Sequence, residues 1–222
     1  MKQNIRDYRG ALFDLDGTLI DSMWIWDSLC RDWLIEQGKN PGPELEKTIE
    51  LMTPAQSAEY VIRRYRLDYS PAEINARWNA AALDRYQHAA PLKAGMAELV
   101  RELHGGGAKL AVVSSCFPEA CQAVLARRGL DRYFSALVYT GETPGNKGDP
   151  GIWLTAAERI GIPPRDCVVF EDLYKALKGV RAAGMGFAVV YDKTCTDWKA
   201  MEAEADYVYG PAFFMEPVNE QD

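Results

Sequence analysis

Apolar and polar positions follow two different periods along the chain, and the period changes near residue 91. Between residues 21 and 90, apolar side chains recur every three or four positions, which is typical of amphipathic helices. Breaks and helix starts divide this stretch, namely Pro41-Gly42-Pro43, Thr53-Pro54 and the capping-box sequence Ser70-Pro71-Ala72-Glu73. The pattern therefore predicts four short helices over 21–90.

Beyond residue 91, short apolar runs alternate with amphipathic stretches, as a parallel sheet with crossover helices requires. Together with a run near the N-terminus, they predict strands at 11–13, 109–113, 136–139, 167–170 and 187–191. The predicted fold class is α/β, a Rossmann-like parallel sheet core with an inserted four-helix cap domain. We expect the core to comprise 1–20 and 91–222, and the cap to comprise 21–90.

Two carboxylates stand at the end of the first predicted strand. Asp14 and Asp16 follow the run Ala11–Phe13 directly, and Gly17 then ends the strand with a turn. Their spacing puts both acids at the carboxyl edge of the sheet, where open α/β sheets keep their sites. Two close carboxylates repel each other when both are ionised, so the pair favours a bound cation or a proton transfer during a reaction.

Composition excludes several classes of protein. The chain has 222 residues, of which 48% are hydrophobic, so a folded core is expected. A net charge of −7 makes nucleic acid and anionic membrane surfaces poor partners. No apolar run approaches the roughly 20 residues of a membrane span, and the first residues lack a signal peptide, so we expect a cytoplasmic protein. The five cysteines are scattered and are expected to be reduced.

The segment Phe13-Asp14-Leu15-Asp16-Gly17-Thr18-Leu19-Ile20-Asp21-Ser22 resembles the first motif of the haloacid dehalogenase-like phosphohydrolase superfamily. The four helices after it resemble the cap of the branch that includes β-phosphoglucomutase and phosphoglycolate phosphatase. The resemblance implies that Asp14 is a nucleophile that carries an aspartyl-phosphate. It also implies that Asp16 protonates the leaving alcohol and later deprotonates the hydrolytic water.

Three further segments match the later motifs of this superfamily. Ser114 closes a predicted strand, and Lys147 precedes a predicted crossover helix, where Gly148 replaces the usual proline and puts the rigidity of that loop in question. Glu171-Asp172 follows the strand 167–170. The resemblance implies a Mg²⁺ site made by Asp14, Asp172 and the Asp16 carbonyl, with Glu171 holding a metal-bound water or Lys147.

The expected function is that of a Mg²⁺-dependent phosphatase acting on a small phosphorylated metabolite. We expect Thr18, Ser114 and Ser115 to contact the substrate, although Ser115 also suits the start of the following helix. Trp24 and Trp26 lie near the start of the cap, where they either cover the leaving group or form cap core. Nothing in the pattern specifies an oligomeric state.

Two alternatives belong to other functional classes. A β-phosphoglucomutase-like phosphotransferase shares the cap and all four motifs, but Trp26 occupies the position expected for its cap histidine, and 51–58 lacks its arginine. Both differences favour hydrolysis. A non-catalytic binding module on the same fold is disfavoured because no catalytic carboxylate is missing. The dehalogenase branch lacks the second aspartate that Asp16 supplies here.

Overall fold

The computed structural model describes residues 4–49 and 52–214, except for the side chains of Trp26, Asp27 and Phe214. Within these ranges a six-stranded sheet has the strand order β3-β2-β1-β4-β5-β6, and every pair is parallel. Its strands are β1 Gly10–Phe13, β2 Lys109–Ser114, β3 Phe134–Tyr139, β4 Cys167–Glu171, β5 Gly186–Val190 and β6 Tyr207–Tyr209. This is the doubly wound order of a Rossmann-like sheet, so the predicted fold class is confirmed.

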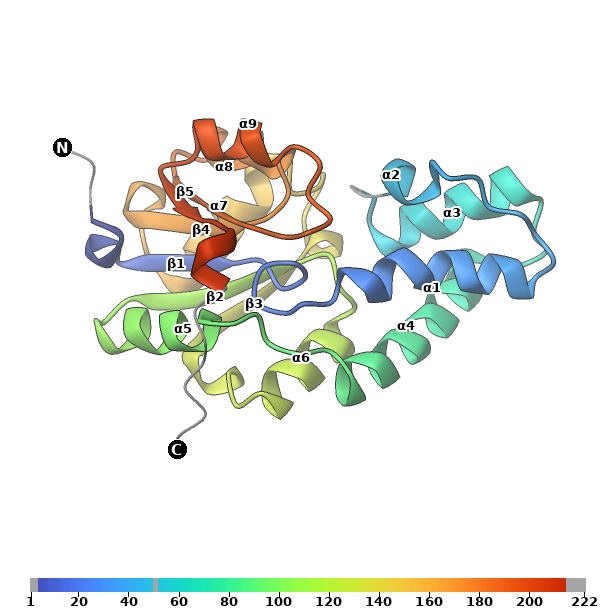
Figure 1. Ribbon diagram of the computed structural model, residues 1–222, viewed down its shortest axis with the longest axis horizontal. Coiled ribbons are helices and arrows are strands. Elements are labelled where there is room, and N and C mark those ends of the chain that lie inside the picture. Colours follow the sequence, from blue (N-terminus) through green and yellow to red (C-terminus); the bar gives the residue numbers. More distant parts are fainter. Residues whose placement is uncertain (1–3, 50–51, 215–222) are drawn as a thin grey trace.

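Both faces of the sheet are covered by helices (Figure 1). Side chains alternate along each strand, so Phe13 and Phe170 point to one face, and Leu12 and Val169 point to the other. Helices α5 Met96–Gly105 and α6 Pro118–Arg127 pack on the first face. Helices α7 Pro150–Ile160, α8 Ala176–Ala182 and α9 Trp198–Glu204 pack on the second. Strands β1, β4 and β5 are buried on both sides, and they are therefore apolar except for Glu171 at the end of β4.

Four helices follow β1, and in Figure 1 they lie beyond the end of the sheet to which β1 points. They are α1 Met23–Glu36, α2 Leu45–Ile49, α3 Pro54–Tyr65 and α4 Pro71–His88. Thr53 and Ser70 begin α3 and α4 with capping boxes, as expected for Ser70 from the sequence. The ring of Trp33 packs edge-on against Trp78, with centroids 5.9 Å apart. We call α1–α4 the helical insert.

The chain enters and leaves the helical insert along two adjacent segments. The amide of Asp21 donates to the Pro91 carbonyl at 3.0 Å, and an antiparallel bridge joins Ile20 to Leu92. Helix α4 also lies along α6 of the core, where the Asn79 amide donates to the Glu119 carboxylate at 3.3 Å. One side of the insert is therefore fixed to the core.

The C-terminal part of the core was not predicted in full. Helix α9 and strand β6 were not predicted, because seven and three residues are too few to show a clear hydrophobic period. The remaining regular elements are 3-10 turns at Ile5–Asp7, Asp131–Tyr133, Thr140–Glu142, Pro164–Asp166 and Pro211–Phe214. The last of these turns begins the C-terminal tail, in which 215–222 lie outside the described residues. Across the described part of the chain, each helix is too short or too polar to cross a membrane.

Candidate active site

The sheet brings the two predicted acidic motifs together. Strand β1 pairs with β4 so that Phe13 lies opposite Phe170, and the amide of Asp14 donates to the Phe170 carbonyl at 3.0 Å. The residues that follow, Asp14 on one strand and Glu171 on the other, therefore start from adjacent strand ends. The chain turns to opposite sides of the sheet after β1 and β4, and doubly wound folds bind ligands at this switch point.

Asp14, Glu171 and Asp172 form a buried acidic cluster. Each offers a carboxylate oxygen, and these oxygens lie within 4.8 Å of one another. The exposed fractions are 4%, 0% and 8% respectively. Burial first, and then the charge of Asp14, raises the pKa of Glu171. Burial, followed by the charges of Glu171 and Asp14, raises the pKa of Asp172 well above its ordinary value.

Lys147 provides a positive charge inside the acidic cluster. Its ammonium contacts the Asp14 carboxylate and lies 3.0 Å from Glu171 Oε2. Burial lowers the pKa of Lys147, but the charges of Asp14 and Glu171 outweigh burial and raise it above its ordinary value. Three carboxylates and one ammonium leave an excess of negative charge when all are ionised. This oxygen-rich, acidic donor set fits a hard divalent cation.

The loop that carries Lys147 is held by its own hydrogen bonds. The indole of Trp153 donates to the Lys147 carbonyl at 2.8 Å, and the Gly148 amide donates to Asn146 Oδ1 at 2.8 Å. A proline at 148, as the family pattern usually has, could not make the second bond. Gly179 of α8 packs so closely that an added Cβ would lie 2.8 Å from the Asp149 carbonyl. The replacement of proline by glycine therefore leaves a well-supported loop.

The chain turns over residues 15–18, directly after Asp14. We call this segment the catalytic turn, after the role that the sequence predicts for it, and its conformation requires Gly17. Its φ of +78° is in the left-handed region, and an added Cβ would meet the Asp172 carboxylate. The next residue, Thr18, is fully buried, and its hydroxyl donates to Asp172 Oδ1 at 3.1 Å. Thr18 was expected at the substrate, but its described contact is with the acidic cluster. Its role in substrate binding stays a prediction.

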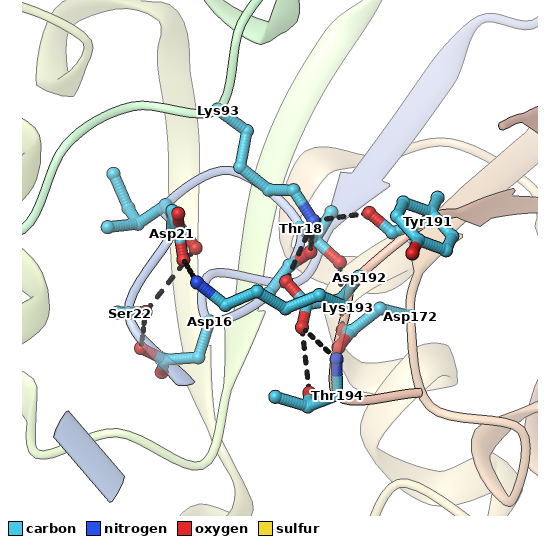
Figure 2. Close-up of polar contacts among 12 residues, drawn as sticks. Asp16, Thr18, Asp21, Ser22, Lys93, Asp172, Tyr191, Asp192, Lys193 and Thr194 are labelled. Carbon is cyan, nitrogen blue, oxygen red and sulfur yellow. Dashed lines mark hydrogen bonds and ion pairs between the residues drawn. The ribbon is translucent and has the colours of Figure 1, made fainter. Parts of the chain in front are cut away.

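Asp16 is half-buried, and its carboxylate lies outside the acidic cluster. Figure 2 shows it directed toward Ser22, whose hydroxyl donates to Asp16 Oδ1 at 2.6 Å. The hydroxyl of Tyr86, from α4, donates to the same oxygen. Asp16 is thus held by donors from both ends of the helical insert. No sequence pattern pointed to Tyr86, because its helical spacing is only that of a buried position.

A second buried ionic group, which we call the hinge pair, lies on the other side of the catalytic turn. Lys93 Nζ lies 3.0 Å from Asp192 Oδ2, with the two side chains 9% and 3% exposed. Lys93 also donates to the carbonyls of Gly17 and Tyr191 (Figure 2). Burial alone would raise the pKa of Asp192, but Lys93 and the two donors of Thr194 lower it. Neither residue was singled out from the sequence.

The remaining predicted residues lie at the end of β2 or just after it, and in the first turn of α1. Ser114 is fully buried at the end of β2, and its hydroxyl accepts from the Cys116 amide at 2.9 Å. Ser115 is half-buried and does not cap the next helix, which begins at Pro118 after Phe117. Trp24 is 38% exposed, and its indole donates to the Asp21 carbonyl at 3.1 Å. Trp26 lies in α1, and its side chain is outside the described residues.

A pocket of about 500 Å³ lies between the helical insert and the loop before Lys147. Most of the side chains that line it are polar. Helix α3 contributes Gln56, Glu59, Tyr60 and Arg63, and the remaining lining residues are Thr48, Met52 and Asn146. Another pocket, of about 380 Å³, lies between α6 and the first half of β3. That position is at the opposite strand ends from the acidic cluster, whereas the first pocket includes Asn146, which directly precedes Lys147.

Known proteins resemble the chain over most of its length. The family model of haloacid dehalogenase-like hydrolases matches residues 11–190. Fructose-1-phosphate phosphatase YqaB of Escherichia coli is 28% identical over 179 residues, which cover 80% of this chain and 94% of that protein. A probable pseudouridine-5'-phosphatase of Drosophila melanogaster is 27% identical over 205 residues, which cover 90% of this chain and 88% of that protein.

Solved structures show the same fold. CbbY from Rhodobacter sphaeroides, in a mutant form with xylulose-1,5-bisphosphate, has a TM-score of 0.80 at 18% identity, covering 90% of this chain and 93% of that chain. β-Phosphoglucomutase from Clostridium difficile has a TM-score of 0.74 at 16% identity, covering 90% of each chain. At these identities the likeness concerns the fold alone.

Proposed function

The chain belongs to the haloacid dehalogenase-like hydrolase family, and on that basis we propose that it is a Mg²⁺-dependent phosphatase of small phosphomonoesters that works through an aspartyl-phosphate. The observation that carries the proposal is the acidic cluster with Lys147 at the switch point of the sheet. The predicted family membership is confirmed. The metal, the intermediate and the substrate are our proposals.

Asp14 is the proposed nucleophile. It stands at the end of β1, where a carboxylate oxygen attacks phosphorus while the bond to the leaving alcohol breaks. Lys147 holds the Asp14 carboxylate in place and balances charge on the phosphoryl group. Asp14 and Asp172, with the Asp16 carbonyl, would hold Mg²⁺, and Glu171 would orient Lys147. When bound, Mg²⁺ supplies positive charge that neutralises the phosphoryl oxygens.

Asp16 is the proposed acid and base. Its carboxyl gives a proton to the leaving alcohol oxygen when the aspartyl-phosphate forms, and its carboxylate then takes a proton from the water that attacks phosphorus. Its carboxylate is not one of the three that form the acidic cluster, and it accepts from the hydroxyls of Ser22 and Tyr86. Ser114, at the end of β2, donates to a phosphoryl oxygen in this proposal, and Ser115 lies next to it.

The polar pocket supports a hydroxyl-rich leaving group. Amide, carboxylate, phenol and guanidinium groups line it from α3, which suits a sugar or polyol better than an apolar alcohol. The relatives are named as phosphatases of fructose 1-phosphate, of hexitol phosphates and of pseudouridine 5'-phosphate, which are all hydroxyl-rich esters. We propose that α1–α3 act as a lid over this pocket, with α4 fixed to the core.

The test is phosphate release from a panel of esters with and without Mg²⁺. The panel comprises fructose 1-phosphate, sorbitol 6-phosphate, pseudouridine 5'-phosphate, phosphoglycolate and 4-nitrophenyl phosphate. We expect the polyol and sugar esters to have the highest kcat/KM. Arg63→Met should raise KM for them by about tenfold and leave 4-nitrophenyl phosphate nearly unchanged. Arg64→Met is the matched control, because the neighbouring Arg64 lies over the Tyr65 ring and does not line the pocket.

The same assay separates hydrolysis from phosphotransfer. With β-glucose 1-phosphate and a bisphosphate primer, a hydrolase releases inorganic phosphate faster than glucose 6-phosphate appears. The reverse order would replace this proposal with the mutase alternative. Full activity in excess chelator, with the metal content measured, would remove the cation from the mechanism.

A further inference from the structure

The loop before α7 holds the side chain of Asn146 in one orientation. Its Oδ1 accepts from the Gly148 amide at 2.8 Å, and its backbone amide donates to Asp149 Oδ2 at 3.0 Å. Gly145 allows this turn, because its φ is +89° and an added Cβ would meet the Asp149 carboxylate. A backbone amide can only donate, so the carboxamide oxygen of Asn146 faces Gly148 and its NH₂ group is directed elsewhere.

The NH₂ group of Asn146 is a hydrogen-bond donor at the polar pocket. Among the described residues, Nδ2 makes no hydrogen bond, whereas Oδ1 and the backbone groups of Asn146 each have a partner. Asn146 is half-buried and lines the pocket opposite the residues of the helical insert. It also directly precedes Lys147, whose ammonium contacts Asp14. The core therefore contributes one wall of the pocket, and that wall is joined to the acidic cluster through the backbone.

The orientation of Asn146 depends on Gly148. A proline at this position, as the family pattern usually has, carries no N–H group to donate. Its ring would occupy the space where the Gly148 amide hydrogen now points at Asn146 Oδ1, and an added Cβ at Gly148 would lie 3.0 Å from the same oxygen. The carboxamide would then have to move. The replacement of proline by glycine therefore orients Asn146 as well as supporting the loop.

We propose that Asn146 is a specificity-determining residue, whose NH₂ group donates a hydrogen bond to a hydroxyl or carbonyl oxygen of the leaving group. This inference rests on the proposed function, because the pocket receives a leaving group only if the chain is a phosphatase. The bond is made to a part of the substrate that does not react. It therefore strengthens binding of sugar and polyol esters equally in the ground state and the transition state, which lowers KM and leaves kcat unchanged.

Asn146→Ala tests this role by removing the donor. One probe is the sugar or polyol ester of the panel with the highest wild-type kcat/KM, and the other is 4-nitrophenyl phosphate, whose leaving group has no hydroxyl or carbonyl oxygen. The loss of one hydrogen bond should raise KM for the sugar or polyol ester by about three- to tenfold. The kcat for this ester, and both constants for 4-nitrophenyl phosphate, should change by less than about twofold.

Gly148→Pro tests the orientation, and it keeps the inference falsifiable if Asn146→Ala does not fold. This variant retains the carboxamide and removes the amide hydrogen that holds it, while the proline ring stiffens the loop. We expect KM for the sugar or polyol ester to rise by about threefold or more. The kcat/KM for 4-nitrophenyl phosphate should fall by less than about threefold.

Asp149→Ala is the matched control. It removes the bond that the Asn146 backbone amide makes to Asp149, and it leaves the Gly148 amide as the donor to the carboxamide. Weaker support of the loop should change kcat/KM for both probes by the same factor. A preferential loss on the sugar or polyol ester in this variant would show that the loop, rather than the carboxamide, determines the preference.

Several other outcomes would overturn the inference. An equal loss on both probes in Asn146→Ala would assign Asn146 to support of the loop, and no loss would mean that it does not contact the leaving group. A wild-type KM for the sugar or polyol ester in Gly148→Pro would show that the Gly148 amide does not orient Asn146. A wild-type enzyme that hydrolyses none of the sugar and polyol esters would refute the proposed function, and this inference with it. An active wild-type enzyme with an unaffected Asn146→Ala variant refutes only the role of Asn146.

Discussion

Two buried ionic groups lie on either side of the catalytic turn, and they differ in their balance of charge. The acidic cluster gathers three carboxylates around the single ammonium of Lys147, so it carries excess negative charge. The hinge pair sets one carboxylate against one ammonium, and Lys93 and Asp192 both have further hydrogen-bond partners. A balanced pair needs nothing more, whereas an unbalanced cluster is stable only with a cation or protons. This difference favours a reactive or cation-binding role for the acidic cluster and a purely structural role for the hinge pair.

The largest effect is expected at Asp14, the proposed nucleophile in the acidic cluster. Asp14→Asn is nearly isosteric but cannot accept a phosphoryl group, so kcat should fall by at least about a thousandfold. The melting temperature without metal should not fall, because one of the repelling charges has been removed. Phosphate release and thermal unfolding measure the two quantities. Substantial activity in a preparation shown by mass spectrometry to lack wild-type enzyme would mean that Asp14 is not the nucleophile.

Asp172→Asn tests the excess charge directly. The Mg²⁺ concentration for half-maximal activity should rise by about 10- to 100-fold, while the metal-free variant should melt at a higher temperature than the wild-type protein. Because the pKa of Asp172 is raised in the folded state, the folded protein binds this proton more tightly than the unfolded chain, and stability falls as pH rises above the unfolded value.

The stabilising effect of Asp172→Asn should therefore be greater at pH 8 than at pH 5. Thermal unfolding in chelator at the two pH values measures it, and Thr18 still has an amide oxygen to which it can donate. A variant with the wild-type Mg²⁺ requirement would show that Asp172 does not bind the cation.

Breaking the hinge pair should act on stability first. Lys93→Met leaves Asp192 buried without a counter-ion and removes the donor to Gly17, so the free energy of unfolding should fall by about 3–5 kcal/mol. Lys93→Met combined with Asp192→Asn should be less damaging than the sum of the two single variants. Urea unfolding gives all three values. Additive losses would show that the two side chains do not interact.

The smallest effect is expected at the exposed ion pair between Lys193 and Asp21. Lys193 lies 3.7 Å from Asp21, but the two side chains are 64% and 39% exposed. Water screens such a pair, so Lys193→Ala should change stability by less than about 1 kcal/mol. The same urea unfolding assay measures it. A loss as large as that of Lys93→Met would mean that burial does not determine how much these two ion pairs contribute to stability.

The sequence predicted those parts of the fold and the site that depend on local pattern. Apolar runs specify β1 and β4, and the acids that follow each run, Asp14 and Asp172, are adjacent to their strands in the chain. The donors around Asp16 and Gly17 could not be found in this way. Tyr86 is 70 positions from Asp16, and Lys93 is 76 from Gly17, so only the folded chain brings them together.

The bridge between Ile20 and Leu92 has a consequence for how such enzymes diversify. The chain enters and leaves the helical insert at this bridge. The insert can therefore change in length or sequence while β1 and β2 keep their register. The entropic cost of closing this connection changes slowly with its length. Each doubling of the length lowers the free energy of unfolding by about 0.6 kcal/mol. A helical segment from a relative, transplanted between the two bridge residues, should therefore leave the sheet and the acidic cluster in place, while it replaces Ser22 and Tyr86, the donors to Asp16.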